Sequence, residues 1–173
     1  MIIFLLGSGG SGKTTIAKNL IKYGYRLPTI ITTRQPRNDD INQEYVSIEI
    51  FEQLRERLAT EVLINGFKYG LKDNLKGNIV IPMDIFTLQQ LENKGFDIIS
   101  VYLNVSYEEL EKRLIKRGEA RHVIDKKLNN HKKFMQQEMQ YADLVVDNTQ
   151  PVDKVVKQII NYISKRKGGL YDL

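Results

Sequence analysis

A glycine-rich run near the start of the chain constrains the fold more than any other feature. It reads Gly7-Ser8-Gly9-Gly10-Ser11-Gly12-Lys13-Thr14 and follows the apolar residues 2–6. The run matches the phosphate-binding loop G-x-x-x-x-G-K-[ST], in which glycines let the backbone approach a phosphate and a helix N-terminus points at it. The sequence therefore predicts a buried strand, a phosphate-binding loop and a helix, in that order.

Each position of this loop has an expected role. In the motif the lysine reaches the outer phosphates of a nucleotide, and the hydroxyl after it ligates Mg²⁺. We therefore expect a nucleotide with Mg²⁺ at this loop, with Thr14 as the metal ligand. The expected nucleotide-binding residues, which the resemblance given below assigns to ATP, are the loop and its successor: Gly7, Ser8, Gly9, Gly10, Ser11, Gly12, Lys13, Thr14 and Thr15.

A second motif overlaps the first. Gly7, Gly9 and Gly12 also fit the dinucleotide pattern G-x-G-x-x-G, which requires an acidic residue ~20 positions later to hold a ribose hydroxyl. The first acidic residue of the chain is Asp39, well past the end of the next expected strand. Nicotinamide or flavin binding is therefore not expected.

Composition excludes several other classes of protein. The 173 residues, of which 42% are hydrophobic, suffice for one domain with a core. Without cysteine and with two histidines, the chain cannot form disulfides or zinc ribbons or use a thiol nucleophile. No stretch suits a signal peptide or a membrane span, so we expect a cytoplasmic protein without a membrane partner.

The net charge of +5 is unevenly distributed. Residues 1–38 contain six basic and no acidic side chains, so the excess surrounds the glycine-rich loop. Such a local field suits a small polyanionic substrate, and no basic patch with interleaved aromatic residues follows. A nucleic-acid polymer is therefore not the expected partner.

Downstream patterning predicts alternating strands and helices, with one interruption at residues 34–72. Parallel strands are expected near 26–31, 78–82, 97–103 and 142–146. The interruption carries a short strand, a small helix and a hairpin-like pair of strands, and Arg34 and Arg37 around Pro36 can grip a phosphate. Asp84 follows a strand, where it can cap a helix, meet a ligand, or do both.

With these motifs in place, the chain resembles the guanylate kinase family over nearly its whole length. The resemblance rests on the glycine-rich loop and on four later groups of residues. These are Thr32-Thr33-Arg34-Gln35-Pro36-Arg37, Glu44-Tyr45-Val46-Ser47 with Phe51, Gly66-Phe67-Lys68-Tyr69-Gly70, and Arg113 with Arg117-Gly118.

The resemblance implies a three-layer α/β P-loop kinase fold, with a five-stranded parallel sheet, a small mixed α/β nucleotide-monophosphate-binding insert and a helical lid. It implies one domain over residues 1–173: a core of 1–33, 73–116 and 127–173, an acceptor-binding insert of 34–72, and a lid at about 117–126. The implied acceptor-binding residues are Arg34, Arg37, Tyr45, Glu61, Tyr69 and Asp84. The implied catalytic residues, all cations around the transferred phosphoryl group, are Lys13, Arg113, Arg117 and Lys127.

The implied activity is transfer of the γ-phosphoryl group of Mg-ATP to a nucleoside monophosphate, with GMP or dGMP as first choice. Departures from the family pattern leave the acceptor open, because Ile30 or Ile31 and Leu71 replace hydroxyl residues and Pro82 replaces an acid. One alternative is another phosphate ester such as ribose 1,5-bisphosphate. Others are a non-catalytic guanylate-kinase-like binding domain or a nucleotide-hydrolysing switch. The sequence also leaves open donor preference and whether the protein is a monomer or a homodimer.

Overall fold

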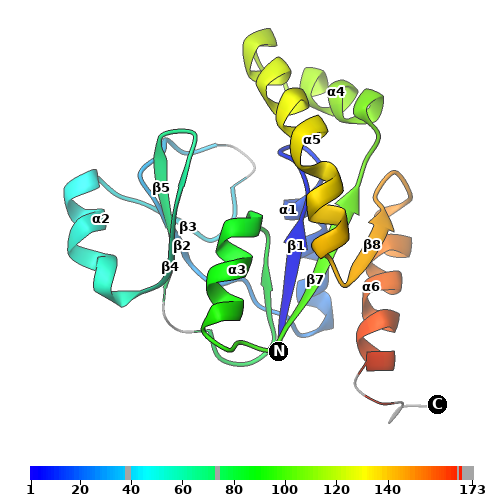
Figure 1. Cartoon of the computed structure of the whole chain (residues 1–173), viewed down its shortest axis with the longest axis horizontal. Helices are drawn as coiled ribbons and strands as arrows, with labels where there is room; N and C mark the ends of the chain where they lie inside the picture. The colour runs from blue at the N-terminus through cyan, green and yellow to red at the C-terminus, as the bar shows by residue number, and fades with distance from the viewer. Residues whose placement is uncertain (38–39, 73–74, 167, 169–173) are drawn as a thin grey trace.

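The centre of the molecule is a sheet of four parallel strands (Figure 1). The computed structural model describes residues 1–37, 40–72, 75–166 and 168. In spatial order the strands are β6 (Ile79–Ile81), β1 (Ile2–Leu6), β7 (Ile98–Asn104) and β8 (Leu144–Asp147). Every residue of β1 and β6 is buried, as expected of parallel strands covered on both faces.

A fifth core strand was expected near residues 26–31, and the described residues form only a remnant of it. Arg26 makes a single parallel bridge to Ile79 at the edge of the sheet. Its N–H donates to the Asn78 carbonyl at 3.0 Å, and its own carbonyl accepts from the Val80 N–H at 2.9 Å. Pro28 then follows, which has no N–H to continue a ladder, and the chain leaves this sheet.

Helices cover both faces of the core sheet. The alternation of β1 sends Ile3 and Leu5 to one face and Ile2, Phe4 and Leu6 to the other. The first face packs against α1 (Lys13–Leu20) and α6 (Val152–Arg166), and the second against α3 (Ile85–Asn93) and part of α5 (Arg121–Tyr141). Helix α4 (Tyr107–Lys116) packs on α5, and two short 3₁₀ turns are η1 (Ile21–Tyr23) and η2 (Arg55–Arg57).

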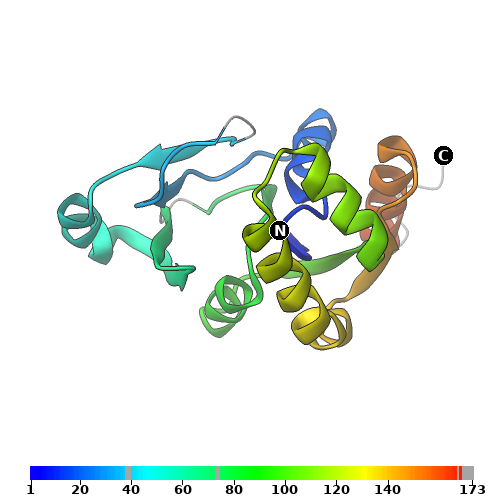
Figure 2. The same ribbon diagram turned by 90° about the horizontal axis from the view of Figure 1, so that it is seen from above.

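A second, mixed sheet stands beside the core (Figure 2). Its order is β3 (Gln43–Tyr45), β2 (Ile30–Thr32), β5 (Phe67–Lys72) and β4 (Leu58–Ile64). Helix α2 (Ile48–Leu54) packs on it through buried Phe51. Strand β2, expected in the core, belongs to this sheet because it pairs with β3 and β5. We call this sheet with α2 the insert lobe.

Two local features shape the insert lobe. The antiparallel pair β4 and β5 is joined by Asn65 and Gly66, whose φ angles of 53° and 84° suit a two-residue hairpin turn. Across β2, Thr32 lies opposite Tyr45 on one side and Tyr69 on the other. This register gathers residues from three separate strands in one row. In the described part of the chain no helix is both long and apolar enough to cross a membrane.

Candidate active site

A cavity of about 910 Å³ lies between the core and the insert lobe. The glycine-rich loop lines it from the core, with Lys13 and Thr14 among the lining residues. Arg34, Arg37 and Tyr69 line it from the insert lobe. The two groups of residues singled out in the sequence, far apart along the chain, therefore share one cavity.

The backbone of the glycine-rich loop takes conformations that side chains would obstruct. Gly7, Gly10 and Gly12 have φ angles of 131°, 100° and 99°. A Cβ atom on Gly12 would lie 2.7 Å from Nδ2 of Asn148. Asn148 is buried and donates from that nitrogen to the Ser11 carbonyl at 2.5 Å. The loop is thus held from behind by a residue that the sequence analysis did not single out.

Lys13 is folded back onto its own loop. Its Nζ donates to the carbonyl of Gly7 and, at 3.1 Å, to that of Ser8. Burial lowers the pKa of the Lys13 amine to about 8, although the carboxylates of Glu138 and Asp84 act in the opposite direction. Glu138, from α5, also lines the cavity, and burial raises its pKa. It too was missed, because a single glutamate on a long charged helix gives no sequence signal.

Asp84 combines a cap with a place in the cavity wall. Its Oδ1 accepts from the N–H groups of Phe86 at 2.9 Å and Thr87 at 3.2 Å, which begins α3. Its Oδ2 accepts from the Thr87 hydroxyl at 2.9 Å. Pro82, just after β6, lines the cavity but offers no side-chain oxygen.

The oxygen donors present suit Mg²⁺ that arrives with a nucleotide. The Thr14 hydroxyl and the carboxylates of Asp84 and Glu138 belong to residues that line the cavity. Within the described ranges, no group of three or more His, Cys, Asp or Glu side chains could enclose a metal. Mg²⁺ commonly keeps several waters and binds one or two carboxylates plus substrate phosphates, so a sparse oxygen set fits it.

The insert lobe gathers the residues Arg34, Arg37, Tyr45 and Tyr69, which we call the arginine–tyrosine cluster. Tyr45 and Tyr69 flank Thr32 on neighbouring strands, and Arg34 follows Thr32 by two residues. The Arg34 guanidinium lies 5.8 Å from the centre of the Tyr45 ring, and its side chain is 5% exposed. The strand register therefore brings Arg34 and Tyr45 together.

The carboxylate of Asp40 lies inside this cluster. Its Oδ1 accepts from Nη2 of Arg34 at 2.5 Å. Its Oδ2 accepts from the Tyr45 hydroxyl at 2.5 Å and from the backbone N–H of Arg37 at 2.7 Å. Burial opposes ionisation of Asp40, but these hydrogen bonds outweigh it and lower the pKa of the carboxyl. Asp40 was not singled out in the sequence, because its partners Arg34 and Tyr45 come together with it only in the folded chain.

Arg113 binds the back of the glycine-rich loop. Its Nε donates to Oε1 of Glu109 at 2.8 Å, its Nη1 to the Ser11 carbonyl at 3.2 Å, and its Nη2 to the Asn148 carbonyl at 2.8 Å. Arg113 also lines the cavity. These contacts connect α4 to the loop, so the guanidinium supports the loop from behind as well as facing the cavity.

The other two predicted catalytic cations share one carboxylate. Lys127 Nζ donates to both carboxylate oxygens of Glu119, at 2.6 and 2.5 Å. Arg117 Nη1 lies 3.8 Å from Oε1 of the same group. Both cations line the cavity. Glu119, between α4 and α5, is a further residue that the sequence analysis did not consider.

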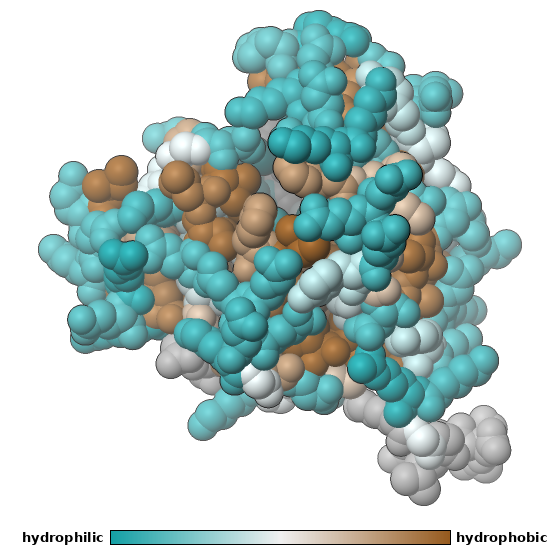
Figure 3. Space-filling view, in the orientation of Figure 1, coloured by the Kyte–Doolittle hydropathy of each residue, from teal (hydrophilic) through white to brown (hydrophobic). Residues whose placement is uncertain are grey.

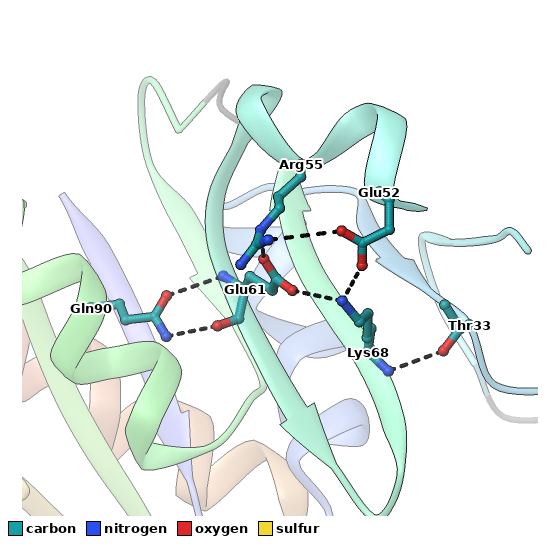
Figure 4. A network of polar contacts seen from close by, with 6 residues as sticks. All are labelled: Thr33, Glu52, Arg55, Glu61, Lys68 and Gln90. Carbon is teal, nitrogen blue, oxygen red and sulfur yellow. Dashed lines mark hydrogen bonds and ion pairs between the residues drawn. The ribbon is translucent and has the colours of Figure 1, made fainter. Parts of the chain in front are cut away.

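Glu61 lies outside the cavity, although it was expected to meet the acceptor. Its carboxylate accepts from Arg55 at 2.7 Å and from Lys68 at 3.2 Å, and Lys68 also pairs with Glu52 (Figure 4). The backbone of Glu61 is clamped by Gln90 of α3 (Figure 4). It is absent from the lining of the cavity. The cross-strand lysine satisfies this acid, so its carboxylate is part of an ion-pair network.

Helix α5 connects these parts. It contributes Lys127, Phe134 and Glu138 to the cavity wall, and buried His131 accepts or donates a 2.8 Å hydrogen bond with the Ser8 hydroxyl. Burial lowers the pKa of His131. His131 is therefore a packed and hydrogen-bonded histidine.

A family profile described as an AAA domain (AAA_18) matches residues 3–136, which is more than half of the chain. The chain belongs to this family of AAA domains. A probable thymidylate kinase of Thermoplasma volcanium is 24% identical over 201 residues, covering 97% of this chain and 100% of that protein.

Solved structures show the same fold. Guanylate kinase from Anaplasma phagocytophilum superposes with a TM-score of 0.71 and 19% identity, covering 97% of this chain and 86% of that one. Deoxyadenosine kinase from M. mycoides with bound dATP matches with a TM-score of 0.51 and 20% identity, covering 95% of this chain and 100% of that one. The protein therefore has the fold of P-loop kinases.

Proposed function

We propose that this protein is an ATP-dependent kinase that transfers the γ-phosphoryl group to the phosphate of a nucleoside monophosphate. The observation that carries the proposal is the shared cavity, lined by Lys13 and Thr14 on one side and by Arg34, Arg37 and Tyr69 on the other. Two groups of anion-binding residues facing one space suit a reaction between two phosphates. The kinases among its relatives and structural neighbours support the same activity.

The residues present fit the needs of phosphoryl transfer. Its transition state is loose and charge-rich, so positioning and electrostatic stabilisation do most of the work. Lys13 binds the donor's outer phosphates, the arginine–tyrosine cluster orients the acceptor, and Arg117 and Lys127 supply positive charge between them. Mg²⁺ held by Thr14 and the donor would supply further charge neutralisation.

The division of labour follows the architecture. The core sheet and its helices bind the donor. The insert lobe, which begins at β2, binds the acceptor. The segment at about 117–126, which follows α4 and includes the beginning of α5, acts as the lid over the transferred group. Closure there excludes water, whose attack would hydrolyse ATP.

The acceptor site has an apolar wall. Ile30, Ile64, Met83 and Ile85 line the cavity, and Leu71, which pairs with Ile30 across β2 and β5, is fully buried. In the space-filling view, apolar surface gathers between the insert lobe and the core (Figure 3). GMP or dGMP is the first acceptor to test, because the guanylate kinase superposes at a TM-score of 0.71. Since this wall offers few groups to read a base, ribose 1,5-bisphosphate is the second.

The proposal is tested by incubating the protein with Mg-ATP and a panel of acceptors while ADP release is followed. The panel holds the common nucleoside and deoxynucleoside monophosphates and ribose 1,5-bisphosphate. We expect acceptor-dependent release that Arg34→Gln lowers by about 100-fold or more in kcat/KM. Arg166→Gln is the matched control, because Arg166 pairs with Asp143 on the surface and does not line the cavity.

Two results would contradict the proposal. ADP release that is equal with and without every acceptor indicates a nucleotide-hydrolysing switch. Binding of ATP without turnover of any acceptor indicates a non-catalytic binding domain.

A further inference from the structure

The arginine–tyrosine cluster already holds an anion, and that anion is part of the chain. Three donors from three residues converge on the Asp40 carboxylate at 2.5 to 2.7 Å: Arg34, Tyr45 and the backbone N–H of Arg37. A guanidinium, a hydroxyl and a backbone amide are also the groups that commonly bind phosphate oxygens. Asp40 thus takes the contacts that an acceptor phosphate needs.

Arg34 has little capacity for a second anion while Asp40 is bound. Its Nη2 donates to Asp40 and, at 2.7 Å, to Oε1 of Gln43. Its Nη1 donates to the Gln35 carbonyl at 2.7 Å, and the side chain is 5% exposed. A phosphate group that takes the Asp40 contacts must therefore displace the carboxylate. Two negative groups cannot share one buried guanidinium without strong repulsion.

We propose that Asp40 is a specificity-determining residue of the kinase proposed above, acting as an internal anion that the acceptor phosphate must replace. Until then it holds Arg34 and Tyr45 in the geometry in which they bind phosphate. A ligand that carries only a carboxylate gains little by replacing the Asp40 carboxylate, because the two groups have the same charge. A phosphate dianion brings more charge and a third oxygen, so the exchange favours phosphate esters over carboxylates and unphosphorylated compounds.

The test measures the affinity of the wild-type protein and of its variants for inorganic phosphate by calorimetry, at a pH above the second pKa of phosphate. The phosphate binding that is lost in Arg34→Gln is the binding that occurs at the arginine–tyrosine cluster. Asp40→Asn removes the competing charge and keeps the shape of the side chain. If the carboxylate occupies the cluster most of the time, the variant binds phosphate about tenfold more tightly.

Glu44→Gln is the matched control. It makes the same change of net charge one residue from Tyr45, but Glu44 pairs with Lys72 and does not line the cavity. We expect its phosphate affinity to stay within about twofold of wild type, because that charge is screened by solvent. Weaker or unchanged phosphate binding by Asp40→Asn would overturn the inference, because Asp40 would then only position its neighbours.

A second measurement does not depend on the variant's folding. In crystals of the wild-type protein grown with sulfate, the ion should lie on Arg34 and Tyr45 with Asp40 turned away. Asp40 still bound to both, with sulfate elsewhere, contradicts the inference. ADP release by the wild-type protein is measured separately. If the wild type turns over an acceptor but Asp40→Asn does not bind phosphate more tightly, the exchange at Asp40 is refuted and the kinase is not. If Asp40→Asn binds phosphate more tightly but the wild type turns over no acceptor, the kinase is refuted and the exchange is not.

Discussion

Single residues at this site are held by protein partners that compete with their proposed ligands. Lys13 donates to two carbonyl groups of its own loop, Asp40 binds Arg34, and Glu119 binds Lys127. Each pairing satisfies a buried or half-buried charge that would otherwise destabilise the fold. Under the function proposed above, each substrate phosphate must displace one of these protein partners.

Lys13→Met should separate activity from stability. The unbranched apolar side chain fills similar space but has no amine, so we expect turnover to fall by at least about 100-fold. The folded-state pKa of Lys13 is lowered to about 8, below that of the unfolded chain. The buried charge therefore destabilises the wild type fully below about pH 8, and this destabilisation fades as pH rises towards the unfolded pKa of about 10.4.

Urea unfolding of both proteins at several pH values measures the effect. Relative to wild type, the advantage of Lys13→Met should shrink by on the order of 2 kcal/mol between about pH 7 and about pH 10. Tyrosines that titrate in this range are common to both proteins and cancel. A difference that does not change with pH would mean that the amine keeps an ordinary pKa.

In the insert lobe, the pairing register of the strands decides which side chains meet. The pairing of Thr32 with Tyr45 and Tyr69 aligns three strands, which builds the arginine–tyrosine cluster. In the same lobe, β4 and β5 place Glu61 against Lys68. A residue assigned by its position in a motif can therefore end in an ion pair, as Glu61 does.

Glu61→Gln tests whether this acid contributes to acceptor binding. Because its carboxylate pairs with Arg55 and Lys68 outside the cavity, we expect the acceptor KM to stay within about twofold of wild type. The free energy of unfolding should fall by about 1 kcal/mol or less, as for other partly exposed ion pairs. A KM raised by about tenfold or more, with stability unchanged, would show that Glu61 contacts the acceptor.

At the scale of the whole molecule, the site exists only where two lobes meet. The glycine-rich loop belongs to the core sheet, and the arginine–tyrosine cluster belongs to the insert lobe (Figure 2). A ligand that spans both should therefore stabilise the protein more than one that contacts the core alone.

An adenosine–guanosine pentaphosphate, which joins a donor and an acceptor through one phosphate chain, can test this. At ~100 times its Kd, a ligand adds about 2.7 kcal/mol, which raises the melting temperature by roughly 5–10 °C at this chain length. At the same free concentration of each ligand, we expect the shift to exceed that of ATP, because a ligand that contacts both lobes has the lower Kd. In Arg34→Gln it should drop to the ATP value, and in Arg166→Gln it should match wild type. Equal shifts with both ligands in the wild type would show that the insert lobe does not bind the second phosphate end.

The sequence by itself determined the parts that depend on near neighbours. The glycine-rich loop between β1 and α1, the cap of α3 at Asp84 and the Asn65-Gly66 turn follow from local sterics and hydrogen bonding. The alternation of strands and helices predicted an α/β fold with a parallel sheet, and the structure confirms it. The guanylate-kinase resemblance is only partly supported, because the neighbouring structures show the fold and leave the acceptor a proposal.

Only the tertiary structure decided which strand joins which sheet and which charges pair. Pro28 cuts the expected fifth strand to the single bridge at Arg26, and β2 pairs with the insert lobe. The partners Asp40, Glu119 and Glu138 carry no motif, because a charge finds its partner through space after strands and turns have set their positions. Strands and charges pair with partners that are distant in the sequence, because unpaired buried polar groups are costly anywhere in the molecule. A short window of sequence therefore does not show which partners pair.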